Sequence, residues 1–289
     1  MMKPEFLPII LSALLAMKAA GGNTVAASYE EARSALKQTN LSPAETGRAF
    51  ALMKQAAEAG HLPAMKGLAY LYESGIGTKK SRTIALEWYR RAADQDDPVS
   101  QFNLAHLLVS HPQQPGETPE SVNSRMTEGV EWYRRAADHG LTRACSAYGV
   151  ILMRGDYQTL PDPAKAARYL IKAADDNDLE AMNALGLMYQ SGNGVPYDLG
   201  AAETYLRNAA MAGHVKARAN LGDLLDPNAQ DRKRRIEAIA WLTLAEKAQD
   251  PVARRVLSVK GQAVSPDDMK AGRTMAAELE RQAQTGKKP

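Results

Sequence analysis

Apolar residues recur along the chain in short stripes with helical spacing. In one stripe, Ala181, Leu185, Met188 and Tyr189 fall at i, i+4, i+7 and i+8, which places them on one face of a helix. Glycines, a proline and an aspartate follow, the residue types that end one helix and cap the next. A second apolar stripe then begins. Runs of β-branched residues are almost absent, so the pattern predicts pairs of helices and no sheet.

The pattern is periodic. The octapeptide EWYRRAAD occurs at residues 87–94 and again at 131–138. It belongs to a series of alanine pairs, the last reduced to one alanine, at intervals of 36, 44, 37, 36 and 36 residues. A second series of small residues, which we call the anchors, has the same intervals; it comprises Ala64, Ser100, Ala144, Ala181, Ala217 and Ala253. Two series in one phase indicate an internal repeat, in which stacked helix pairs bury a continuous core.

The repeat resembles that of the Sel1-like family, a branch of the tetratricopeptide-type helical solenoids. One matching copy comprises Ala181, Leu185, Gly186, Tyr189, Gly192, Gly194, Val195, Asp198, Ala202, Tyr205, Ala209 and Ala210. Another comprises Ala64, Leu68, Tyr72, Gly75, Gly77, Ala85, Trp88, Arg91, Ala92 and Ala93. The resemblance covers about residues 44–260. It implies an all-α fold, a right-handed α-solenoid of stacked antiparallel helix pairs, and adaptor, assembly or regulatory roles rather than catalysis.

The spacing predicts the domain organisation. We expect repeats at 60–95, 96–139, 140–176, 177–212 and 213–250, irregular N-terminal capping helices at 28–59, C-terminal capping helices at 251–283 and a tail at 284–289. The 44-residue interval predicts an exposed loop at 110–124, either a tolerated insertion or a recognition element. Family members with cysteine pairs clip each repeat with a disulfide, whereas this chain has one cysteine, Cys145.

The N-terminus is typical of an export signal. Lys3 precedes an apolar run at 6–17, and small residues lead to a cleavage site expected before Ser28. We therefore expect a signal peptide at 1–27 and a periplasmic protein; an uncleaved anchor or a disordered start is the alternative.

The net charge of +3 gives no general attraction to nucleic acids or membranes. The basic run at 232–235 is either a solvated turn or a docking point for an acidic partner or anionic lipid.

Candidate chemistry is sparse. No HExxH or CxxC spacing occurs, so we expect no metal, no cofactor and no catalytic residue. Ser34 and Lys37 fit the S-x-x-K pattern of penicillin-interacting enzymes, but neither S-D-N nor K-T-G accompanies them. Trp88, Trp132 and Trp241 occupy the bulky position before the alanine pairs and are interpreted as packing residues.

A partner surface is expected on the first helices, which commonly line the concave side of such solenoids. Counting from the anchors, the candidate partner-binding residues are Lys66, Tyr70, Glu73, Phe102, His106, Ser146, Asn183, Leu187, Gln190 and Asp223. Their mixed polarity suits a protein segment rather than nucleic acid. The leading hypothesis is a monomeric, non-enzymatic periplasmic scaffold, adaptor or regulator that binds another envelope protein. The alternatives are an immunity protein against a secreted lipase or cell-wall hydrolase, a β-lactam-interacting enzyme using Ser34 and Lys37, and a peptidoglycan-associated spacer.

Overall fold

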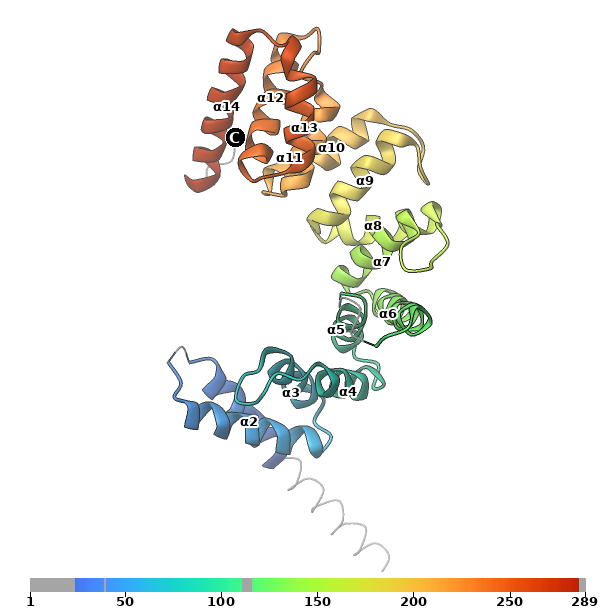
Figure 1. Ribbon diagram of the computed structural model, residues 1–289, viewed down its shortest axis with the longest axis vertical. Coiled ribbons are helices and arrows are strands. Elements are labelled where there is room, and N and C mark those ends of the chain that lie inside the picture. Colours follow the sequence, from blue (N-terminus) through green and yellow to red (C-terminus); the bar gives the residue numbers. More distant parts are fainter. Residues whose placement is uncertain (1–23, 39, 111–115, 286–289) are drawn as a thin grey trace, which may run out of the picture. The chain divides into compact units, whose positions relative to one another are not determined.

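The computed structural model describes residues 24–38, 40–110 and 116–285 (Figure 1). Within these ranges the fold is all-α, an α-solenoid of consecutive packed helix pairs with no strand, as the sequence predicts. The chain divides into two compact units, Met1–His139 and Gly140–Pro289, called here the N-terminal unit and the C-terminal unit. None of the helices in the described ranges has the length and apolar content needed to cross a bilayer.

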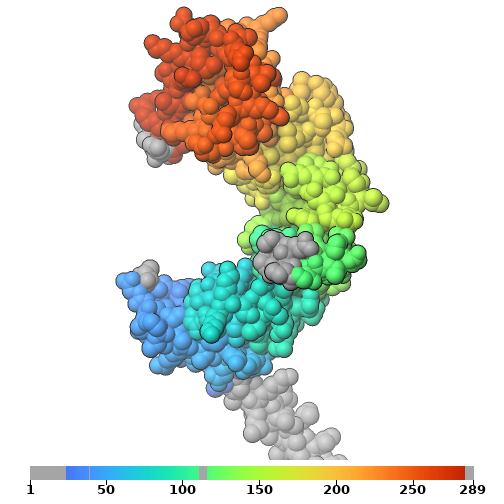
Figure 2. All heavy atoms as spheres, in the orientation of Figure 1, coloured from blue at the N-terminus to red at the C-terminus, as the bar shows by residue number. Residues whose placement is uncertain are grey.

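In the N-terminal unit, a helix at 24–36 precedes the helices of the repeats. These are α2 (Pro43–Glu58), α3 (Leu62–Ser74), α4 (Arg82–Ala93), α5 (Pro98–Val109) and α6 (Pro119–Asp138). Each helix from α2 to α5 packs against the helix that follows it in the chain. Figure 2 shows the blue N-terminal helices directly against the cyan α3 and α4. The helices α3 and α5 are therefore equivalent, because each is the first helix of a repeat and packs against the second helix, α4 or α6.

The C-terminal unit contains the remaining helices. They are α7 (Thr142–Arg154), α8 (Pro163–Asp175), α9 (Leu179–Ser191), α10 (Leu199–Met211), α11 (Val215–Leu225), α12 (Arg232–Lys247), α13 (Pro251–Val259), the 3-10 turn η2 (Gly261–Ala263) and α14 (Pro266–Thr285). Neighbouring first helices also touch, since α7 contacts α9, α9 contacts α11 and α11 contacts α13. The terminal helix α14 packs on α12 (Figure 1).

Side-chain caps fix where the helices begin. Ser42 and Glu45 form a capping box at the start of α2, in which each side chain accepts a backbone N–H of the other. Asp97 accepts the N–H of Ser100 to cap α5, and Asp198 caps α10 in the same way. These short polar residues satisfy backbone donors that a helix leaves unpaired at its first turn.

The glycine-rich turns have a steric cause. Gly75 ends α3 in the left-handed conformation at φ 75°, which glycine adopts without strain. Two residues later, a Cβ added to Gly77 would lie 2.7 Å from the backbone oxygen of Thr46 in α2. Gly194 is equivalent in the C-terminal unit, where an added Cβ would lie 2.4 Å from the backbone of Pro163. The turn of each of these two repeats therefore rests on the preceding repeat, and only glycine fits.

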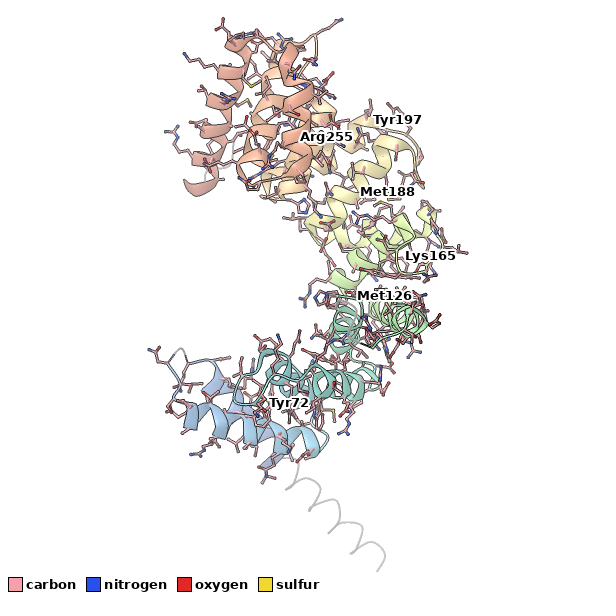
Figure 3. All side chains as sticks on the ribbon, in the orientation of Figure 1. Tyr72, Met126, Lys165, Met188, Tyr197 and Arg255 are labelled. Atoms are coloured by element: carbon pink, nitrogen blue, oxygen red, sulfur yellow. The ribbon has the colours of Figure 1, made fainter. Side chains whose placement is uncertain are left out.

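The core consists of the residues that repeat along the sequence. The alanine pairs are buried, and Trp88, Trp132 and Trp241 are 7%, 8% and 4% exposed, which confirms that they are packing residues. Tyr72 also serves packing, because its ring meets that of Phe50 edge-on between α3 and α2 (Figure 3). Met188, on α9, is 1% exposed. Bulky side chains beside small ones thus fill the space between successive helices.

Two boundaries differ from the prediction. The expected loop at 110–124 is shorter, because α6 already begins at Pro119. Thr118 caps that helix by accepting the N–H of Ser121, and Glu120 lies in its first turn, so the insertion lengthens a helix. Residues 111–115 of the expected loop lie outside the described residues.

At the C-terminus, α14 runs to Thr285 and includes the first two residues of the expected tail. Most of the predicted signal segment also lies outside the described residues; 24–27 are helical.

Candidate protein-interaction site

A groove lies on the first-helix face of the N-terminal unit. It has a volume of about 460 Å³ and is called here the N-terminal groove. Twelve residues line it: Tyr29, Arg33, Leu36, Lys37, Met53, Pro63, Lys66, Gly67, Tyr70, Tyr89, Val99 and Asn103. Two of them, Lys66 and Tyr70, belong to the predicted partner surface. Tyr70 is 54% exposed, an unusual state for a large aromatic side chain.

Hydrogen bonds fix the side chains around Tyr70. The hydroxyl of Tyr89, from α4, donates to Oε2 of Glu73 on α3 at 3.0 Å. Burial raises the pKa of Tyr89 well above its ordinary value, and the charge of Glu73 adds to the effect, so the phenol stays protonated. Glu73, another predicted residue, is therefore an acceptor inside the unit and holds the ring of Tyr89 at the edge of the groove.

Lys66 is held by the next repeat. Its Nζ lies 3.0 Å from Oδ1 of Asp97, whose other oxygen accepts the N–H of Ser100 at 2.7 Å. Burial acts to raise the pKa of Asp97, but the hydrogen bonds from Ser100 and Lys66 outweigh it and hold the pKa below its ordinary value. The pair joins α3 to the start of α5. It is only partly exposed, at 29% and 12% for the two side chains.

A second aromatic cluster extends from α5. The rings of Phe102 and His106 stack with centroids 6.3 Å apart, and Tyr133 from α6 meets Phe102 edge-on at 5.4 Å. The Tyr133 hydroxyl lies 3.3 Å from Nδ1 of His106. Phe102 is half-buried and His106 is exposed. The five candidate residues of the N-terminal unit therefore belong to α3 and α5, and two of them, Tyr70 and His106, are exposed.

The candidate residues of the C-terminal unit are less accessible. Ser146 donates to Asp178 at 2.7 Å, and Asn183 accepts from the amide of Asn220 at 2.8 Å; both Ser146 and Asn183 are only 4% exposed. The expectation that these two side chains point into a partner-binding surface is wrong, because each is buried and bonds to the next repeat. Leu187 and Gln190 are half-buried. Asp223 is partly exposed and pairs with Lys260 at 2.8 Å.

The sequence analysis did not name Tyr89, which lines the N-terminal groove, or Tyr133, which belongs to the aromatic cluster of α5. Both lie three positions before an alanine pair, where the C-terminal unit has Leu170, Leu206 and Leu242. The sequence does contain a signal for this difference, because a second position of the repeat also differs between the two units. Five residues after the anchor, the C-terminal unit has Gly149, Gly186 and Gly222 and the N-terminal unit has Ala69 and Ala105.

The exchange has a physical reason. A Cβ added to any of the three glycines would lie 2.5–2.7 Å from Cγ of the facing leucine, so branched leucine requires glycine. The N-terminal unit instead combines alanine with tyrosine, whose hydroxyl extends to the first helix. The C-terminal unit is thus closed by apolar packing where the N-terminal unit presents hydrogen-bonding groups.

The basic run at 232–235 is not a free docking point. Nε of Arg232 and Nε of Arg235 each lie 2.8 Å from an oxygen of Asp268, and Arg234 pairs with Glu203 at 3.0 Å. Three of the four cations therefore have partners inside the unit, and two of them attach α14 to α12. Hydrogen bonds from Arg235 and Arg232 lower the pKa of the buried Asp268. The run is therefore not the solvated turn of the other interpretation either: it forms the first turn of α12, and two of its arginines hold the terminal helix.

The described residues contain no group of three or more His, Cys, Asp or Glu side chains placed to hold a metal ion. Ser34 and Lys37 are both exposed on the first helix and the residue after it.

The matched family agrees with this geometry. The sequence model of the Sel1 repeat family matches residues 42–61, 62–97, 98–141, 142–178 and 179–214. The chain belongs to the Sel1 repeat family. Four of the matched repeats begin two residues after the starts predicted from the spacing, and the partial match at 42–61 overlaps the end of the predicted N-terminal cap at 28–59. The pair α11 and α12 follows the last match. The Sel1 solenoid is typically a non-catalytic scaffold for protein–protein interaction.

Several relatives share the repeat. Uncharacterized protein NMB1327 of Neisseria meningitidis is 28% identical over 248 residues, which cover 80% of this chain and 51% of that protein. DAP3-binding cell death enhancer 1 of Mus musculus is 30% identical over 190 residues, covering 66% of this chain and 36% of that protein. The chain thus spans about half or less of these relatives, and the similarity concerns the repeats.

Solved structures show the same fold. The antigen c5321 from uropathogenic Escherichia coli aligns with a TM-score of 0.73 at 24% identity, over 93% of this chain and 56% of that chain. A Sel1 repeat protein from Oxalobacter formigenes aligns with a TM-score of 0.60 at 25% identity, over 81% of this chain and 94% of that chain.

Proposed function

We propose that this Sel1 repeat protein is an exported, non-enzymatic protein of the periplasm that binds another envelope protein through the N-terminal groove. The exposure of Tyr70 carries the proposal. Tyr70 is 54% exposed at a groove in which Glu73 holds Tyr89 and Asp97 holds Lys66. Tyrosine is enriched at protein interfaces because it buries a large apolar ring and still offers a hydroxyl.

Rigidity supports the same role. A groove built on packed helices needs little ordering when a partner binds, so less conformational entropy is lost on association. The N-terminal signal pattern supports export. With a single cysteine the chain can form no intramolecular disulfide, so its stability relies on packing.

Site-specific photocrosslinking tests the proposal. A photoreactive phenylalanine analogue replaces Tyr70 in cells that make the protein, and the same analogue replaces Tyr197 as a control. Tyr197 is 64% exposed in the turn between α9 and α10 of the other unit (Figure 3). We expect one discrete protein adduct from position 70 and none from position 197. No adduct at position 70, or an adduct from position 197 alone, contradicts the assignment of the groove.

Two further measurements test the other parts of the proposal. Osmotic shock should release the protein with the periplasmic fraction, and its retention with the cytosol contradicts export. A fluorescent penicillin should leave the protein unlabelled, whereas covalent labelling that disappears in Ser34→Ala shows an enzyme instead of a binding protein.

A further inference from the structure

The charge around the N-terminal groove is uneven. Of the twelve residues that line it, Arg33, Lys37 and Lys66 are positively charged, and none is Asp or Glu. Arg33 and Lys37 come from the first helix and the residue after it, and Lys66 comes from α3. Cations therefore reach the groove from two separate elements.

The nearby carboxylates Asp97 and Glu73 already have partners. Asp97 binds Lys66 with one oxygen and caps α5 with the other, and Glu73 accepts the hydroxyl of Tyr89. In the part of the chain that the structure describes, Arg33 pairs with the exposed Glu30 at 3.4 Å, a contact that solvent screens. Lys37 forms no ion pair with any residue in the described ranges. Arg33 and Lys37 thus keep most of their hydrogen-bonding capacity for a ligand.

The rest of the lining is apolar or carries hydrogen-bonding groups. Leu36, Met53, Pro63 and Val99 contribute apolar surface, while the tyrosines and Asn103 contribute hydroxyl and amide groups. A bare anion such as phosphate would leave the apolar part exposed to water. A chain that carries both carboxylates and apolar side chains would cover both kinds of surface.

We propose that the N-terminal groove binds an extended acidic segment of a partner protein, in which Asp or Glu side chains are interspersed with apolar ones. The carboxylates pair with Arg33 and Lys37, and the apolar side chains cover Tyr70 and the apolar lining. In an extended segment neighbouring side chains point to opposite sides, so one short stretch presents both kinds of group. The inference rests on the proposed function and specifies the chemistry of the segment.

Selection from a phage-displayed library of random linear peptides tests this inference on the purified full chain. The selected peptides should be rich in Asp and Glu next to apolar residues. Their binding should weaken as ionic strength is raised from about 0.05 M to about 0.5 M, because the exposed charges are screened. Arg33→Gln and Lys37→Gln should each reduce affinity by about two- to fivefold, the upper part of the range for one exposed ion pair.

Two control variants separate the outcomes. Lys233→Gln removes an exposed cation of α12 in the other unit and should leave affinity unchanged; an equal loss in this variant shows nonspecific attraction and overturns the inference. Peptides that lose binding in Tyr70→Ala but show no acidic bias overturn the inference and leave the proposed groove intact. Selected peptides that bind Tyr70→Ala as well as the unchanged chain, or the absence of any selected peptide, contradict both.

Discussion

Gly186 offers a direct test of how tightly successive helices pack. It lies in α9, where a Cβ would be 2.5 Å from Cγ of Leu206, 2.8 Å from Cδ2 of the same residue and 3.2 Å from the carbonyl oxygen of Ala202. Carbon atoms in good contact are about 3.5–4.0 Å apart, so Gly186→Ala must move α10 or force Leu206 out of its rotamer. Overpacking of this kind costs about 1–3 kcal/mol of unfolding free energy.

Gly47 provides the matched control. It lies in α2, and a Cβ added there has nothing within 4 Å. Gly→Ala inside a helix gains about 1 kcal/mol from backbone propensity alone. We therefore expect Gly47→Ala to be more stable than the unchanged chain, and Gly186→Ala to be less stable than Gly47→Ala by about 1–3 kcal/mol, because the propensity gain cancels in the comparison.

Denaturant unfolding followed by circular dichroism measures both variants. A double-mutant cycle with Leu206→Ala locates the effect, since Gly186→Ala should lose its penalty once the leucine side chain is absent. If Gly186→Ala and Gly47→Ala stabilise the protein equally, the close approach of α9 and α10 is not what requires glycine, and the argument for the Gly–Leu combination fails.

Three other variants test the core, the pH dependence and the terminal helix. Trp132→Ala should lower the unfolding free energy by about 3–5 kcal/mol in the same denaturant assay, because it empties a buried aromatic site. Asp97 has a lowered pKa in the folded state, so its stabilising effect is present above its unfolded pKa and is lost as pH falls through the folded value. The melting temperature of the unchanged chain should therefore exceed that of Asp97→Asn at about pH 7, and this difference should shrink by about pH 3; a difference independent of pH contradicts the pairing with Lys66. Asp268→Asn should speed proteolysis before α14, because a neutral amide cannot bind both arginines, while the exposed Asp267→Asn should cleave at the rate of the unchanged chain.

The sequence by itself determined the all-α class, the order of the repeats and many of their ends. These features depend on short-range rules: apolar spacing within one helix, capping by residues such as Asp198, and the left-handed conformation at Gly75 and Gly192. The same rules explain why the predicted loop at 110–124 was too long. Thr118, Pro119 and Glu120 are a helix start, and the polar composition of the insertion concealed it.

Only the tertiary structure decided which polar residues are accessible. Lys66 bonds to Asp97, 31 positions away; Ser146 bonds to Asp178, 32 away; and Asn183 bonds to Asn220, 37 away. A count along one helix separates core from surface on that helix, but it does not show what the next repeat covers. Stacking brings residues about one repeat apart into contact, and it buries Ser146 and Asn183 while leaving Tyr70 exposed. Accessibility is therefore a property of neighbouring repeats together, which the spacing within one repeat does not contain.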